Sequence, residues 1–253
     1  MLEIDQLSVT FGGVHALDGV SFEVERGTTV GLIGPNGSGK TTLVNAVTGM
    51  VSATGTVRVD GSELRLGAPG PSYRAGIVRT YQTPRVFADL SCLENVLLAM
   101  RPRHRNGFLG ATVLRREMLG SERERWAEAA ALLERVGLGD RTEAPAGDLS
   151  YGRQRILEFA RGLAAQPSLI LLDEPAAGLN QVETDELAAL IAAVRADGIA
   201  VLVIEHKIDF VTELCERIVV LELGRKIAEG EPAAVFADHR VMDAYLGGRA
   251  EQG

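Results

Sequence analysis

Apolar and polar residues alternate in the first part of the chain, which predicts two strands, from Leu2 to Val9 and from Val20 to Val24. A short continuous apolar run follows from Thr28 to Ile33, as is typical of a strand buried on both faces of a parallel sheet. Glycine-rich residues 34–39 interrupt that run, and the pattern of residues 40–48 predicts a helix. The chain therefore opens with strands and then a strand–loop–helix unit.

The middle of the chain has the periodicity of helices. Apolar residues from Leu93 to Val136 form a stripe that includes Trp126, so we expect this side chain in the core. Strands, a helical insertion and strands again predict one α/β core interrupted by an α lobe at roughly residues 90 to 160. The other predicted elements are strands at 56–59, 77–80, 169–172 and 199–204, helices at 150–165 and 183–195, a hairpin of 217–221 with 225–228, and a helical tail at 232–246.

Composition narrows the class of protein. The 253 residues are 46% apolar and 24% charged, as in ordinary globular domains, and the formal net charge of -8 argues against a nucleic-acid partner. Cys92 and Cys215 lie among apolar neighbours, as buried thiols in a reducing compartment do. From the strand-like pattern that begins at Leu2 we expect no secretory leader, and no apolar run reaches about 18 residues. We therefore expect a cytoplasmic protein that reaches a membrane only through partners.

One segment matches the phosphate-loop pattern G-x-x-x-x-G-K-[ST] in full. It consists of Gly34, Pro35, Asn36, Gly37, Ser38, Gly39, Lys40, Thr41 and Thr42. Its glycines let backbone N–H groups turn toward an anion, and the following helix adds the positive end of its dipole. Lys40 is placed to reach the terminal phosphates of ATP, and the Thr41 hydroxyl to ligate Mg²⁺.

Two carboxylates end a later apolar strand, Leu169 to Leu172. In a parallel sheet the carboxyl ends of the strands lie beside the phosphate loop. We therefore expect Asp173 to hold the Mg²⁺ shell and Glu174 to orient the attacking water and accept its proton.

Further segments carry a resemblance to a known family. Leu149, Ser150, Tyr151, Gly152 and Arg153 resemble the signature motif of ATP-binding-cassette (ABC) proteins. The other family elements follow in the family's order: Gln82 after a strand, like the Q-loop glutamine; Ala177, Gly178, Leu179 and Asn180, like the D-loop; His206 after a strand, like the switch histidine; and Phe11, like the aromatic residue that stacks on adenine. The resemblance covers almost the whole chain.

The resemblance implies a fold and a site. The fold is an α/β P-loop NTPase core with a mixed sheet, an antiparallel β subdomain and an inserted helical subdomain. In one 1–253 domain, the core and β subdomain would span 1–89 and 161–230, the helical subdomain about 90–160, and a helical tail 231–253. Gln82 would join Thr41 and Asp173 around Mg²⁺ and act with Glu174 and His206 in catalysis, while the signature segment would contact ATP held by a second subunit.

Finer details resemble the ATPase subunits of branched-chain (hydrophobic) amino-acid importers, and specifically the longer of their two paralogues. These details are Tyr151 in the signature, the sequence Arg-Thr-Tyr-Gln ending at Gln82, Asn180 in the D-loop, Glu205 before His206, and the close at Ala-Tyr-Leu-Gly. Importers of urea and short-chain amides share most of them. The sequence departs from the common family pattern at Arg153, Asn180, Gln181 and Lys207.

The resemblance also implies partners: a second ATPase subunit, identical or paralogous, two integral membrane permease subunits, and indirectly an external solute-binding protein. The subunit would lie on the inner face of the cell membrane, attached through the permeases. An exporter ATPase is the alternative within transport. A soluble cassette acting on DNA or ribosomes would need a second cassette or a long coiled-coil insertion, and a non-hydrolysing regulator would lack Glu174 or His206, both of which are present.

Overall fold

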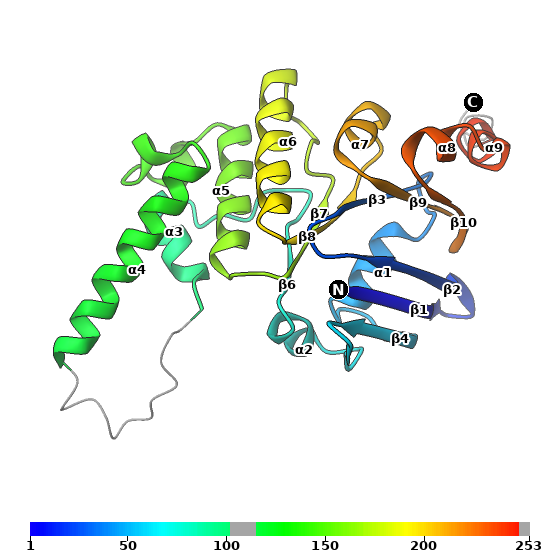
Figure 1. Ribbon diagram of the computed structural model, residues 1–253, viewed down its shortest axis with the longest axis horizontal. Coiled ribbons are helices and arrows are strands. Elements are labelled where there is room, and N and C mark those ends of the chain that lie inside the picture. The colour runs from blue at the N-terminus through cyan, green and yellow to red at the C-terminus, as the bar shows by residue number, and fades with distance from the viewer. Residues whose placement is uncertain (102–114, 248–253) are drawn as a thin grey trace. The chain divides into compact units, whose positions relative to one another are not determined.

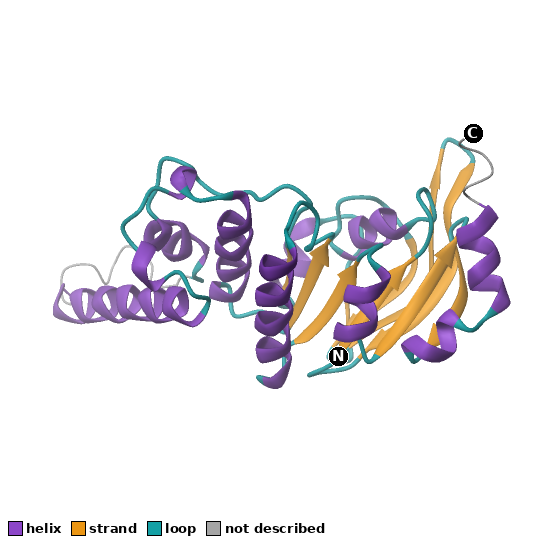
Figure 2. Ribbon diagram, turned by 90° about the horizontal axis from the view of Figure 1, so that it is seen from above, coloured by secondary structure: helices purple, strands orange, loops and turns teal. Residues whose placement is uncertain are grey.

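The computed structural model describes residues 1–101 and 115–247, and its fold is shown in Figures 1 and 2. The chain divides into two compact units, residues 1–82 with 168 onward, and residues 83–167. The second unit contains the predicted helical insertion and is a few residues longer at each end. No helix among the described residues is long and apolar enough to cross a membrane.

The first unit contains a mixed six-stranded sheet with the order β10-β9-β3-β8-β7-β6. The pairs from β9 to β6 are parallel, and only β9 and β10 pair antiparallel, as the hairpin prediction requires. Every residue of β3, β7 and β8 is buried, which explains their continuous apolar sequences. The strands are β3 (Thr29–Ile33), β6 (Ile77–Arg79), β7 (Leu169–Asp173), β8 (Ala200–Ile204), β9 (Arg217–Glu222) and β10 (Arg225–Gly230).

A second, antiparallel sheet has the order β2-β1-β4-β5. Its strands are β1 (Leu2–Phe11), β2 (Val14–Val24), β4 (Thr54–Val59) and β5 (Ser62–Glu63). Helix α1 (Lys40–Val47) lies between the two sheets, and buried residues of both sheets and of α1 form one core (Figure 1). The predicted α/β class, with a mixed sheet and an antiparallel sheet, is therefore confirmed.

The register of the parallel strands aligns their carboxyl ends. Leu32 of β3 pairs with Ile204 of β8, and on the other side of β8 the same Ile204 pairs with Asp173 of β7. The segments that follow these three strands therefore leave the sheet at one edge. They are the phosphate loop, the segment after Asp173, and the segment around His206.

Helices α6 (Gln181–Ala196) and α7 (Ile208–Leu214) cover the face of this sheet opposite α1 (Figure 1). The approach of α7 is close, since a Cβ added at Gly31 of β3 would come within 2.8 Å of Val211. Helix α7 and the short helix α2 (Pro69–Arg74) were not predicted. α7 has only seven residues, and α2 carries two prolines and a glycine that favour a turn.

The predicted helical tail is interrupted and forms two helices, α8 (Pro232–Phe236) and α9 (His239–Gly247). Asp238 explains the interruption, because its carboxylate accepts a hydrogen bond from the Arg240 N–H at 2.9 Å and begins a new helix. Tyr245 of α9 lies near Gly34 of the phosphate loop. Burial raises the pKa of this phenol, and the backbone of Gly34 opposes that rise.

The second unit is a packed set of helices: α3 (Cys92–Ala99), α4 (Arg115–Arg135) and α5 (Tyr151–Ala164). Ser91 and Glu94 form a capping box at the start of α3, and Ser150 caps α5. The predicted stripe is buried at Leu93, Ala129 and Leu133 but not at Trp126, which is 48% exposed. The prediction for Trp126 was wrong because this residue lies at the margin of the stripe and lines a groove between α3 and α4.

Both cysteines are free and buried, as predicted. Burial raises the pKa of the Cys215 thiol to about 12 and also raises the pKa of Cys92. At pH 8 the reactive thiolate of Cys215 is then on the order of one part in ten thousand. We expect Ellman's reagent to label Cys215 slowly in the folded protein and rapidly in guanidinium chloride; labelling at the same rate in both states would contradict this burial.

Candidate functional site

The phosphate loop lies between β3 and α1 and depends on glycine at two positions. Gly34 has a φ of 148°, and a Cβ there would lie 2.1 Å from the carbonyl oxygen of Leu221. Gly39 caps α1 with a φ of 104°, and a Cβ there would lie 2.7 Å from the carbonyl oxygen of Ala16. Any other side chain would clash or strain the backbone, so the loop path is fixed by these glycines.

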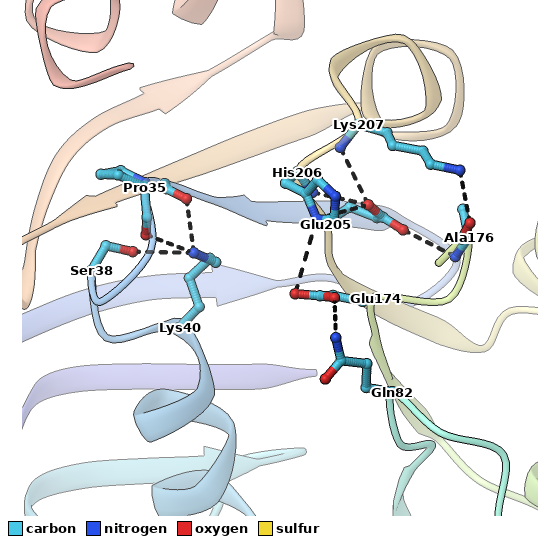
Figure 3. A network of polar contacts seen from close by, with 10 residues as sticks. Pro35, Ser38, Lys40, Gln82, Glu174, Ala176, Glu205, His206 and Lys207 are labelled. Atoms are coloured by element: carbon cyan, nitrogen blue, oxygen red, sulfur yellow. Dashed lines mark hydrogen bonds and ion pairs between the residues drawn. The ribbon is translucent and has the colours of Figure 1, made fainter. Parts of the chain in front are cut away.

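Lys40 lies over the loop that it follows. Its ammonium donates to the carbonyl oxygens of Gly34 and Pro35 at 2.8 and 2.9 Å and to the Ser38 hydroxyl at 3.4 Å (Figure 3). Burial lowers the pKa of this amine, while Glu174 and Asp173 raise it. The ammonium of Lys40 therefore interacts electrostatically with both carboxylates, as expected if the three residues belong to one site.

Asp173 is held at the end of β7 by an ion pair that we did not predict. Arg79 donates to its Oδ2 at 2.6 Å and, with the other terminal nitrogen, to Asn45 of α1 at 2.6 Å. Both charged side chains are about 10% exposed, so this pair is largely removed from water. Arg79 fixes one carboxylate oxygen of Asp173, and Asn45 extends the contact to α1.

Glu174 has the unusual backbone conformation of a residue at a functional turn. Its φ is 47°, in the left-handed region that costs a non-glycine residue free energy, and its N–H donates to the Ile204 carbonyl at 2.9 Å. The Gln82 amide donates to its Oε2 at 2.6 Å, and His206 Nδ1 lies 3.9 Å from its Oε1 (Figure 3). The structure thus brings together the three side chains predicted to be catalytic.

The residues around the loop fit a magnesium ion that is bound together with a nucleotide. Within residues 1–101 and 115–247, no group of three or more His, Cys, Asp and Glu could hold a metal by itself. Thr41 is exposed in the first turn of α1, and Asp173 and Gln82 offer further oxygen atoms. Oxygen donors of this number match Mg²⁺, which usually takes its remaining ligands from phosphates and water.

The segment after Glu174 is tied to the segment around His206. Ala176 accepts a hydrogen bond from Lys207 and donates one to Glu205, a carboxylate with no exposed surface. Residues 177–180, which resemble a D-loop, follow, and Asn180 forms a capping box with Glu183 at the start of α6. No role for Glu205 or Lys207 is predicted from the sequence. The signal was a charged residue directly after a buried strand.

Phe11 lies at the end of β1, where it pairs with Val14 across the turn, and its side chain is 51% exposed. An exposed aromatic ring is available for stacking on a flat ligand.

The signature segment lies in the second unit at the start of α5. Ser150 is exposed, and its hydroxyl accepts a hydrogen bond from the Arg153 N–H at 3.3 Å. Gly152 is buried, whereas Tyr151 is 41% exposed. Leu149, Ser150 and Arg153 line a small polar pocket of about 260 Å³. The N-terminus of α5 is therefore open on the protein surface for a contact from outside the unit.

Comparison with family models decides which family these features represent. The model described as "ABC transporter" matches residues 17–177, which include the phosphate loop, the signature segment and Glu174. The chain belongs to the ABC transporter family. It is an ATP-binding cassette, and cassettes of this family hydrolyse ATP. A second model, described as "Branched-chain amino acid ATP-binding cassette transporter", matches residues 225–251. The resemblance found in the sequence is confirmed.

Curated relatives match this cassette over nearly its whole length. The branched-chain amino acid transport ATP-binding protein BraF of Pseudomonas aeruginosa is 42% identical, and LivG of Escherichia coli K12 is 38% identical. Each alignment covers 98% of both chains.

Solved structures have the same fold. The ADP conformation of an ATP-binding cassette of an ABC transporter superposes with a TM-score of 0.83 at 32% identity, over 98% of both chains. A dimeric cassette in a post-hydrolysis state, bound to ADP and Pi, matches with a TM-score of 0.74 at 26% identity, over 92% of this chain and 99% of that one.

The ion pair between Arg79 and Asp173 leads to a stability prediction. Arg79→Met should lower the free energy of unfolding by about 3 kcal/mol, because it leaves a largely buried carboxylate without its cation. Arg26→Met is the matched control, since Arg26 forms an equally short ion pair with Asp60 on the exposed surface. That change should cost less than about 1 kcal/mol. Urea unfolding measures both, and equal costs would contradict the structural role of Arg79.

Proposed function

We propose that this cassette hydrolyses ATP to drive a membrane importer of branched-chain or other hydrophobic amino acids. The observation that carries the solute class is the match along 98% of the chain to ATP-binding proteins named for branched-chain amino acid transport. The match of residues 225–251 to a model of the same name supports it independently, because this segment lies outside the general ABC transporter match.

The phosphate loop binds the phosphates of ATP through its inward-facing N–H groups and the start of α1. Lys40 turns from the loop carbonyls to the terminal phosphates, a movement of its flexible side chain that leaves the backbone in place. Phe11 stacks on the adenine ring. These roles agree with the glycine-dependent path of the loop and with the exposure of Phe11.

Glu174 acts as the general base. It accepts a proton from a water molecule as the water oxygen forms a bond to the γ-phosphorus. The bond between the γ-phosphorus and the β–γ bridging oxygen breaks, and this oxygen leaves as part of ADP. The proton passes from Glu174 to the released phosphate or to solvent. Gln82 and His206 orient the carboxylate and the water, and their contacts with Glu174 support this assignment.

Thr41, Asp173 and Gln82 would hold Mg²⁺, which would neutralise charge on the phosphates when bound with ATP. Arg79 holds one carboxylate oxygen of Asp173, Oδ2, in the ion pair. Asp173 would thus be oriented by Arg79 while it helps to hold the metal.

Two cassettes, identical or paralogous, close over two ATP molecules. The start of α5, led by the exposed Ser150, contacts the γ-phosphate held by the other subunit through its N–H groups and dipole. The similarity to a dimeric cassette supports this arrangement.

Two membrane permease subunits dock on the helical unit, and an external solute-binding protein delivers the amino acid to them. The unit offers a groove of about 530 Å³ between α3 and α4, which Leu97, Leu98 and Trp126 line. Leu98 and Trp126 are 62% and 48% exposed, and apolar side chains on a surface are typical of a protein contact. The subunit is then held at the cytoplasmic face of the membrane.

Lys40→Ala tests the binding site. Loss of a charge-assisted contact with the phosphates should weaken ATP binding by roughly 10- to 100-fold, which fluorescence titration with a labelled ATP analogue measures. Lys226→Met is a control, because this lysine forms an ion pair with Glu229 in β10. Undiminished affinity of Lys40→Ala would exclude the proposed role.

Glu174→Gln tests the base. The amide cannot take up the proton, so we expect ATP binding with at least about a 100-fold loss of hydrolysis and a stable ATP-bound dimer on gel filtration. Glu63→Gln, on the exposed strand β5, should behave like the unchanged protein. Hydrolysis by Glu174→Gln at the unchanged rate would show that another group is the base.

The solute is tested with the assembled transporter. When this chain is reconstituted with its membrane subunits and the solute-binding protein, leucine, isoleucine or valine should stimulate ATP hydrolysis. Stimulation by urea or a short-chain amide alone would show that the transporter carries a different solute.

A further inference from the structure

The backbone N–H and carbonyl groups of Ala176, two residues after Glu174, both form hydrogen bonds with residues of one other loop. The Ala176 N–H donates to Glu205 Oε1 at 3.0 Å, and the Ala176 carbonyl accepts from Lys207 Nζ at 2.8 Å (Figure 3). Ala176 is fully buried. The Ala176 carbonyl also accepts from the Leu179 N–H at 3.4 Å, so Glu205 and Lys207 supply the two shorter hydrogen bonds of this residue.

The same carboxylate also shapes the loop that carries the switch histidine. Glu205 Oε2 accepts from the N–H groups of His206 and Lys207 at 2.9 and 3.2 Å. Glu205 has no exposed surface, and a buried carboxylate is costly unless its oxygen atoms are hydrogen-bonded. One side chain therefore bridges two loops at a depth where water cannot replace the lost contacts.

The bridged loops are the two that carry groups acting on the γ-phosphate. Ala176 lies two residues after Glu174 and directly before the D-loop, residues 177–180. His206, whose Nδ1 lies 3.9 Å from Glu174 Oε1, follows Glu205. Glu205 thus connects Ala176, at the start of the D-loop, to the backbone of His206 through hydrogen bonds.

We propose that Glu205 and Lys207 are positioning residues for ATP hydrolysis, which lock the start of the D-loop to the loop of His206 so that the two move as one piece. The inference rests on the proposed function, because the roles of Glu174 and His206 in hydrolysis are proposed there. Lys207 takes this role at a position where the common family pattern has a different residue.

Lys207→Met tests the proposal in the full chain, because methionine retains an unbranched apolar chain but cannot donate to the Ala176 carbonyl. We expect kcat for MgATP to fall roughly tenfold, as is typical of a slight misplacement of catalytic groups, with KM and the Kd of a labelled ATP analogue unchanged within about twofold. Lys207→Arg retains a donor and should restore most of the rate. Lys226→Met is the matched control and should leave kcat unchanged.

Hydrogen exchange provides a readout that does not depend on activity. The amides of residues 176–180 should exchange faster in Lys207→Met, and those of α6 beyond its first turn should not. Glu205→Gln is a second variant: its NH₂ group cannot accept a hydrogen bond, so kcat should fall with the ATP affinity retained.

These measurements distinguish failure of the positioning role from failure of the proposed ATPase function. An unchanged kcat in both Lys207→Met and Glu205→Gln would overturn the positioning role, and so would a kcat that falls only in proportion to the folded fraction. If the unchanged protein neither bound nor hydrolysed MgATP, the proposed function itself would fail.

Discussion

The parallel pairing of β8 with β3 on one side and β7 on the other is the constraint on which the site depends. It places Leu32, Ile204 and Asp173 at one level across the sheet. The three loops that follow are not part of the sheet, but because they leave it at this level they lie close to one another. Backbone hydrogen bonds among these three fully buried strands thus set the distances among Lys40, Glu174 and His206.

Side-chain contacts then fix the orientation of groups that the sheet only brings near one another. Arg79 orients Asp173, Gln82 orients Glu174, and Glu205 joins the D-loop to the switch loop. The contacts of Arg79 and Glu205 are shielded from water, where a hydrogen bond or ion pair is strong and a missing partner is costly, whereas the contact of Gln82 is exposed. The left-handed backbone of Glu174, with a φ of 47°, is tolerated because its N–H is fixed by Ile204.

Much of this arrangement could be predicted from the sequence because it is local. The phosphate loop, the carboxylates at the end of β7 and the helix that starts near Ser150 each lie within one short segment whose residue types have a direct physical reason. Arg79 could not be assigned in this way, since its partners Asp173 and Asn45 are 94 and 34 residues distant and a charged residue at a strand end is usually solvated. The roles of Glu205 and Lys207 could not be predicted for the same reason, because their partner Ala176 is distant in the sequence. The exposure of Trp126 could not be predicted because the helical pattern does not show where the buried stripe ends.

A crystal structure of the chain with Mg²⁺ and a non-hydrolysable ATP analogue would show whether these loops form one nucleotide site. We expect the analogue's phosphates in the loop of residues 34–42, with Lys40 at the terminal phosphate and Asp173 in the metal shell. We also expect a water molecule between Glu174 and the γ-phosphorus, and Ser150 of a second copy against that phosphate. An analogue bound elsewhere, or a γ-phosphate more than a water molecule's width from Glu174, would show that the loops do not form this site.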